Sequence, residues 1–246
     1  MTYSSDRTID QKAEHEVHVY LNKYFYPAFQ DTMEPAGRQE QLDGIDMHIC
    51  IQDKWATIDE KAQLTRLNQE ITDITTQAIE IWSKMKNGIY RTGWIYNENS
   101  KTDYYLFMYI TKCGTEFKSD LTCDKIECVR AVLISKAKII EMIRNEGFSL
   151  RNILLFGKAL IKGCFHYEKE TKKRDKVYLH KYLKFPKTTR NLWFCFTAKG
   201  LSEEPVNCVI KWSLYEKYAW KVYDITPSGV VDLKDGGKVV WQIQKN

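Results

Sequence analysis

The sequence predicts an α/β fold in which helices flank a mixed central β-sheet. Apolar residues with a helical period alternate along the chain with strand-like apolar and polar alternation, and no repeat or low-complexity tract interrupts them. The 246 residues, 43% of them hydrophobic, are enough to bury one large core or two small ones. We expect a single domain over residues 1–246, with a core in residues 1–112 and an α/β elaboration in residues 113–246.

Residues 1–112 are expected to contain one long helix and most of the core strands. The helix begins after a Ser or Thr cap near Ser5 and ends near Phe25, and its apolar stripe comprises Ile9, Ala13, Val17, Tyr20 and Tyr24. A β-hairpin follows in residues 43–63, with a polar turn at Gln52-Asp53-Lys54. Further strands are predicted at Gln77–Ser83, Ile89–Tyr96 and Asp103–Ile110.

Residues 113–246 are expected to alternate between strands and helices and to close with a C-terminal β-hairpin. Ser135 can cap a helix that Gly147 ends. The other predicted elements are strands at Ile126–Ile134, Trp193–Thr197 and Val206–Lys211, helices at Leu150–Lys162 and Leu214–Lys221, and a hairpin at Val230–Gln244 turned at Asp235-Gly236-Gly237. Residues 168–190 are mostly basic and are expected to be irregular.

Cysteine usage and hydropathy predict a cytoplasmic protein without a membrane segment. The seven cysteines include no CxxC pair, which argues against a disulfide framework and a zinc knuckle. The first 16 residues lack the apolar segment of a secretion signal, and the apolar run at residues 153–161 is far too short to span a bilayer. We therefore expect a soluble chain in a reducing compartment.

The charges are distributed unevenly along the chain. Residues 1–80 hold 7 Lys or Arg against 15 Asp or Glu, whereas residues 130–190 hold 16 against 5. Converging acids attract metal ions and a basic surface attracts phosphates, so this asymmetry suits an enzyme that acts on a polyanion. A solvated basic helix face accounts for the charge equally well.

The predicted hairpin at residues 43–63 carries acids and a lysine on one face. Because side chains alternate along a strand, Asp59 and Lys61 point the same way, and pairing across the turn can bring Asp46 beside Asp59. Two close carboxylates repel each other unless a cation lies between them, and hard oxygen ligands favour Mg²⁺ or Mn²⁺. The alternative is an exposed hairpin with a cross-strand salt bridge.

The first helix offers a third acid. At 100° per residue Glu16 lies at the inward edge of the apolar stripe, whereas Glu14 and His18 lie on the solvent side. Glu16 is therefore the candidate ligand from this helix, with a border salt bridge to Lys12 or Lys23 as the alternative. His15 and His18 are three residues apart and do not match a zinc-protease helix, which needs a spacing of four.

A helical Glu, then Gly-Ile-Asp at residues 44–46, then Asp-x-Lys at residues 59–61 resembles the PD-(D/E)XK nuclease superfamily, which has the restriction-endonuclease-like fold. The resemblance covers roughly residues 10–110, and Ile45 replaces the proline of the family name. Residues such as Gly93-Trp94 also look like those of uncharacterised bacterial proteins with this core.

The resemblance implies a role for each residue that matches the family motif. Asp46 and Asp59 would bind Mg²⁺ or Mn²⁺, Glu16 would be an accessory metal ligand, and Lys61 would orient the attacking water and offset negative charge. Gln63 and Glu60 would lie just outside this ligand set. The implied reaction is phosphodiester hydrolysis by an endonuclease, with DNA as the expected substrate; RNA and a homodimer stay open.

The segment from Phe165 to Phe185 interleaves aromatic residues with cations, as a surface that follows a phosphate backbone would. The candidate nucleic-acid-binding residues are Lys172, Lys173, Arg174, Lys176, Lys181 and Lys184. Such cations set affinity and read no bases. Two other functions remain open: a nucleic-acid-binding module with little catalysis, and a partner-binding protein whose acidic N-terminal region docks another chain.

Overall fold

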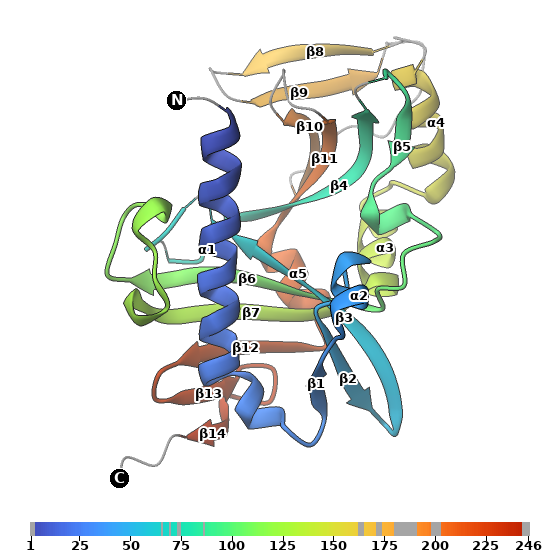
Figure 1. Ribbon diagram of the computed structural model, residues 1–246. Helices are drawn as coiled ribbons and strands as arrows, with labels where there is room; N and C mark the ends of the chain where they lie inside the picture. The colour runs from blue at the N-terminus through green and yellow to red at the C-terminus, as the bar shows by residue number, and fades with distance from the viewer. Residues whose placement is uncertain are drawn as a thin grey trace. The chain divides into compact units, whose positions relative to one another are not determined.

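The fold is taken from a computed structural model, which describes residues 3–64, 66–68, 70–72, 75–85, 87–161, 165–170, 174–179, 191–197 and 203–242. The chain forms two compact units (Figure 1). The first comprises Met1–Thr72, Lys101–Lys136 and Glu216–Asn246, and the second comprises Asp73–Ser100 and Ala137–Tyr215. Residue 112, the predicted boundary between core and elaboration, lies within the middle segment of the first unit.

The first unit is built on an eight-stranded mixed sheet with the order β1-β2-β3-β6-β7-β12-β13-β14. Only the β3–β6 pair is parallel, and the other neighbours are antiparallel. The strands are β1 Met33–Pro35, β2 Met47–Ile51, β3 Lys54–Gln63, β6 Tyr104–Cys113, β7 Ile126–Ser135, β12 Lys221–Thr226, β13 Gly229–Asp232 and β14 Lys238–Gln242. The predicted α/β class and mixed sheet are confirmed, as is the C-terminal hairpin β13–β14.

Helix α1 (Tyr3–Tyr24) packs across one face of this sheet (Figure 1). Val17, Tyr20 and Leu21 are almost fully buried among apolar side chains of β2, β3, β6, β7 and β12. The Tyr20 hydroxyl donates a 3.0 Å hydrogen bond to the carbonyl oxygen of Ile225, so the buried phenol has a partner. The helix predicted from the apolar stripe is confirmed.

Short elements connect the helices and strands of the first unit. The β2–β3 hairpin turns at Gln52 and Asp53, which have φ values of 50° and 61°, and the left-handed backbone at both positions matches the twist of a two-residue hairpin. The other short elements are the helical turns η1 Tyr26–Phe29, η3 Lys118–Asp120 and η4 Cys123–Lys125, and the helix α2 Arg38–Leu42. The sequence pattern did not predict α2.

The second unit is built on a six-stranded antiparallel sheet with the order β5-β4-β11-β10-β9-β8. Its strands are β4 Thr76–Met85, β5 Tyr90–Thr92, β8 Phe165–Glu170, β9 Arg174–Leu179, β10 Leu192–Thr197 and β11 Glu203–Lys211. Helices α3 (Lys136–Asn145) and α4 (Leu150–Ile161) follow the predicted bounds closely. Phe194 lies against both Phe148 and Phe156, with ring centroids 4.8 and 5.2 Å away.

Two local predictions were wrong, and one predicted helix ends earlier than expected. Residues 168–190 were expected to be irregular, but those that the structure describes, 168–170 and 174–179, belong to β8 and β9, and the others lie outside the described residues. The predicted helix Leu214–Lys221 is α5 (Trp212–Tyr218), and the chain then forms β12, where Val222, Tyr223 and Ile225 are buried. The predicted strand Ile89–Tyr96 is only the short β5 followed by the helical turn η2 (Trp94–Tyr96).

Gly93 lies directly after β5, where the chain passes close to β4. A Cβ atom at this position would lie 2.2 Å from the carbonyl oxygen of Glu80 on β4, so only glycine allows the two backbones to approach this closely. The Gly93 N–H donates to the carbonyl oxygen of Ile81 at 2.8 Å, after which the chain turns into η2.

Among the helices described, none is both long and apolar enough to cross a membrane.

Replacing Leu21 with Ala tests how much α1 stabilises the first unit. Leu21 is fully buried, so the change removes apolar contacts and leaves a cavity, and we expect the free energy of unfolding to fall by about 2–5 kcal/mol. Urea denaturation measures the change. Asn22→Ala, at the exposed neighbouring position, is the control and should alter stability by less than about 0.5 kcal/mol. Equal effects of the two variants would contradict this packing of α1.

Candidate active site

The β2–β3 register brings Asp46 and Asp59 together, as the strand pattern predicted. Met47 pairs with Ile58 at the end of the strand ladder, the Asp46 N–H donates to the carbonyl oxygen of Ile58 at 2.8 Å, and the Asp46 side chain is hydrogen-bonded to that of Asp59. Ile58 belongs to the core beneath α1, so both acids lie on the other face of the sheet. Asp59 is 6% exposed, so one of the two carboxylates is buried.

Asp46 lies immediately before the first residue of β2, at the point where β3 extends beyond the end of its partner strand. Beyond Ile58 the remaining residues of β3 pair only with β6, on its other side. The Asp46 carboxylate accepts a 2.7 Å hydrogen bond from the Glu60 N–H, a group that a longer β2 would otherwise satisfy. This bond fixes the orientation of the Asp46 carboxylate beside Asp59.

Lys61 forms an ion pair with Asp59, since its Nζ contacts Asp59 Oδ1. Burial raises the pKa of Asp59 from 3.8 to about 7, Lys61 opposes this rise, and the charge and hydrogen bond of Asp46 add to it. Near neutral pH the two carboxylates therefore retain a proton for much of the time. A site that holds a proton between two acids can exchange it for a cation.

Glu16, the predicted third ligand, is used elsewhere. Its Oε2 accepts a 2.8 Å hydrogen bond from the Cys123 N–H, which ties α1 to the η4 turn. Glu14 retains solvent contact, as predicted, yet it is the helix acid that is coupled to the site. Loss of solvent raises the Glu14 pKa, the Lys61 charge lowers it, and the charges of Asp10 and Asp46 raise it. The helical period could not indicate this coupling, because the coupling depends on where the helix crosses β3.

Glu60 lies on the opposite face of β3 from Asp59, toward α1. Its Oε2 is 3.0 Å from His18 Nδ1, and its Oε1 accepts a hydrogen bond from the Tyr26 hydroxyl. The hydrogen bond to Glu60 raises the pKa of His18, and burial together with the Glu60 charge raises that of Tyr26. Glu60 therefore links α1 and η1 to the strand that carries Asp59. Gln63, at the end of β3, pairs in register with Tyr109.

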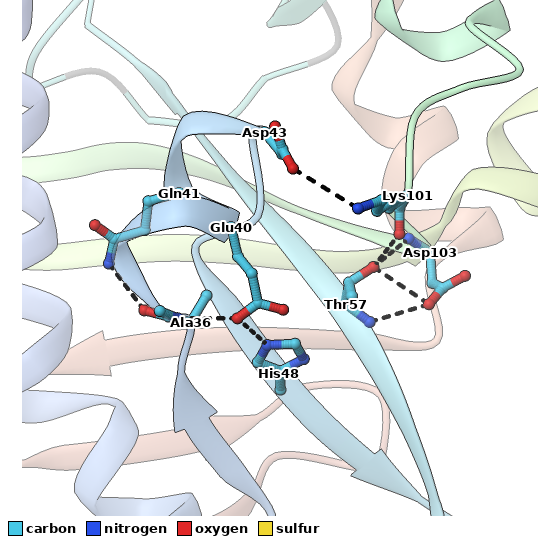
Figure 2. Close-up of polar contacts among 9 residues, drawn as sticks. Ala36, Glu40, Gln41, Asp43, His48, Thr57, Lys101 and Asp103 are labelled. Atoms are coloured by element: carbon cyan, nitrogen blue, oxygen red, sulfur yellow. Dashed lines mark hydrogen bonds and ion pairs between the residues drawn. The ribbon is translucent and has the colours of Figure 1, made fainter.

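A polar network beside the hairpin holds α2 and the segment before β6 in place (Figure 2). Glu40 Oε2 lies 3.2 Å from His48 Nε2 and accepts a 3.0 Å hydrogen bond from the Gly37 N–H, and that backbone bond is the main cause of the lowered Glu40 pKa. Across the hairpin, the Thr57 N–H donates to Asp103 Oδ2 at 3.0 Å. These contacts anchor both segments to β2 and β3.

The carboxylates of this site fit a cation that also takes ligands from water and substrate. Among the residues described, no group of three or more His, Cys, Asp or Glu side chains is arranged to hold a metal ion. Mg²⁺ commonly binds through one or two carboxylates and completes its shell with water and phosphate oxygens. Asp46 and Asp59 meet that requirement, and Glu14 adds negative charge nearby.

The predicted nucleic-acid-binding residues are only partly described. Arg174 and Lys176 lie on β9 of the second unit. Lys172, Lys173, Lys181 and Lys184 lie outside the described residues. Their role stays a prediction.

No protein-family model matches the chain, and no curated protein or solved structure matches it either.

Replacing Asp59 with Asn tests the electrostatic description of the site through stability. The Asp59 pKa is raised from 3.8 to about 7 on folding, so between these values the folded chain binds more protons than the unfolded chain. Stability therefore falls as pH rises through this range. We expect Asp59→Asn to flatten this fall and to be more stable than the wild type at pH 8, by up to a few kcal/mol.

Urea denaturation between pH 4 and pH 8, without divalent cations, measures the slope. Gln63→Ala alters the same strand face without changing a titratable group, and it should keep the wild-type slope. A slope that Asp59→Asn leaves unchanged would rule out the raised pKa.

Proposed function

We propose that this chain is a metal-dependent nuclease that hydrolyses phosphodiester bonds in DNA, built on a restriction-endonuclease-like core. The observation that supports this most directly is the juxtaposition of Asp46 and Asp59 on one sheet face, with Lys61 paired to Asp59. The resemblance of these residues to the PD-(D/E)XK motif supports the same reaction. Two carboxylates can hold a metal ion, and an ammonium can stabilise the charge that develops on the phosphate oxygens.

Each residue of the site has a defined part in this proposal. Asp46, oriented by the Glu60 N–H, and Asp59 would hold Mg²⁺ or Mn²⁺, which would polarise the phosphate and lower the pKa of a bound water. Lys61 would place its positive charge where negative charge develops on the phosphate oxygens. Glu14 would add to the negative charge that attracts the cation. Glu16 is no longer proposed as a ligand, because its carboxylate binds the Cys123 N–H.

Metal binding at this site should release a proton. A cation must displace the proton that Asp59, with a pKa of about 7, retains at lower pH. We therefore expect the affinity for Mn²⁺ to rise between pH 6 and pH 8, by up to about tenfold per unit below pH 7. Calorimetry in buffers of different ionisation enthalpy measures both the affinity and the proton release.

Asp46→Asn is the matched variant, because it keeps the shape of the side chain while removing a ligand charge. It should weaken Mn²⁺ binding at every pH. Binding that neither releases a proton nor depends on Asp46 would place the cation elsewhere on the chain.

A second candidate function is a nucleic-acid-binding module without catalysis. Its supporting observation is that Lys61 forms an ion pair with Asp59 in the absence of a metal. An ion pair of this kind can be purely structural. The two candidates differ in whether Lys61 contributes to a reaction rate.

Replacing Lys61 with Ala separates the two candidates. In a nuclease the ammonium serves the transition state more than the bound state, so we expect cleavage to slow about a hundredfold or more while DNA and Mn²⁺ binding change little. The measurement is nicking of supercoiled plasmid with Mg²⁺ or Mn²⁺, with EDTA as the metal-free control. Lys101→Ala is the control variant, because Lys101 is exposed and pairs with Asp43 at 3.7 Å.

The outcomes assign the function. DNA binding by the wild type without cleavage, over a broad set of substrates, would support the binding module. Equal cleavage by the wild type and the Lys61→Ala variant would show that the hairpin is not the active site.

A further inference from the structure

The first unit contains a cavity of about 360 Å³ that lies apart from the candidate active site. Its walls come from both ends of the strand order, with β1 and β2 on one side and β12, β13 and β14 on the other. The sheet therefore curls around the cavity. Asp46, Asp59 and Lys61 do not line it. A cavity of this size falls in the range of small-ligand sites, which often lie in the mouths of curled sheets.

Aromatic rings form part of the cavity wall. Phe29 and Tyr223 meet edge to face, with ring centroids 5.5 Å apart, and both line the cavity. Trp220 lines it as well and is 44% exposed, so part of its indole remains accessible. Rings of this kind favour a flat ligand that can stack.

A charged cluster lies on the same wall. Lys221 Nζ is 2.7 Å from Asp232 Oδ2 and 2.6 Å from Asp235 Oδ2, and these bonds raise the pKa of Lys221, which stays an ammonium. The Asp232 side chain is only 3% exposed, and its Oδ1 accepts a 2.9 Å hydrogen bond from the Lys234 N–H. Lys238 lines the cavity as well, so the wall carries two cations and two carboxylates that already neutralise much of each other's charge.

This combination selects among classes of ligand. An anion would approach the two carboxylates and a cation would approach the two lysines, so neither is favoured by the balanced charge of the wall. An aliphatic ligand would leave buried polar atoms facing an apolar group, which is costly. A flat, uncharged ligand with apolar faces and an edge of donors and acceptors fits both the aromatic and the polar wall.

We propose that this cavity binds a single nucleobase extruded from DNA, an inference that rests on the proposed nuclease function. A nucleobase has the required flat faces and the required edge, and proteins that extrude a base hold it by stacking and by hydrogen bonds to its edge. Trp220 supplies the stacking surface, and Lys221 with Asp232 reads the edge. Residues that hold the phosphate backbone read no bases, so base preference would come from this cavity.

Binding of the four 2′-deoxynucleosides tests the proposal. The full-length chain carrying Asp59→Asn is titrated by calorimetry or ligand-observed NMR without divalent cations. We expect saturable binding with a preference for one base, and we expect the added Trp220→Ala change to weaken it about 5- to 150-fold, the scale of one stacking contact. Trp220→Phe should restore most of the affinity.

The control is Trp55→Ala on the same background. Trp55 lies on β3, is 54% exposed and does not line the cavity, so its removal should leave nucleoside binding unchanged. Asp232→Asn should alter the ranking of the four bases, because it converts a pure acceptor into a mixed donor and acceptor. Thermal unfolding confirms that each variant is folded before it is titrated.

Three results would overturn the proposal: no saturable binding, equal losses from Trp220→Ala and Trp55→Ala, or a base ranking that folded Asp232→Asn leaves unchanged. Free nucleosides contain no phosphodiester bond, so the measurement is independent of cleavage. Nucleoside binding by a chain that never cleaves DNA would overturn the proposed nuclease function and leave the base-binding cavity standing.

Discussion

The arrangement of the candidate site depends on one mismatch in strand length, since β2 begins at Met47 whereas β3 continues to Gln63. The edge of β3 that β2 leaves uncovered needs a hydrogen-bond acceptor, and the Asp46 carboxylate provides it at the Glu60 N–H. That bond holds Asp46 beside Asp59. On the opposite face, His18 and Tyr26 hold the Glu60 side chain, so the strand is fixed from both sides.

Burial makes it unfavourable for Asp46 and Asp59 to carry negative charge together, and a bound cation would relieve that repulsion. Asp59 is removed from water while Asp46 lies next to it, and Lys61 offsets only part of the cost. A protein gains nothing in stability from such an arrangement, which a pair of apolar side chains would avoid. Sites in which burial and neighbouring charges shift a pKa this strongly are commonly functional.

The sequence predicted the features that depend on local geometry. A two-residue turn and the strand period fix which residues of a hairpin face each other, so the Asp46–Asp59 pairing followed from the pattern. The crossing point of α1 over β3 depends on packing across the whole sheet, so the roles of Glu14 and Glu16 could not be read from the helical period. The strands β8 and β12 were missed because basic residues and a preceding helix obscured their alternation. The two compact units were not predicted, because local patterns do not say which sheet a strand joins.

The parallel pairing of β3 with β6 has a consequence for the order in which the chain folds. Parallel neighbours need a long connection, and here it includes Asp73–Ser100 of the second unit. The first unit also needs β12, which follows the last segment of the second unit. On the ribosome, β7 emerges well before β12, and the edge of β7 that pairs with β12 is uncovered in the interval. Nascent chains that end between β7 and β12 therefore expose an unpaired strand edge that can pair with another chain and favour aggregation.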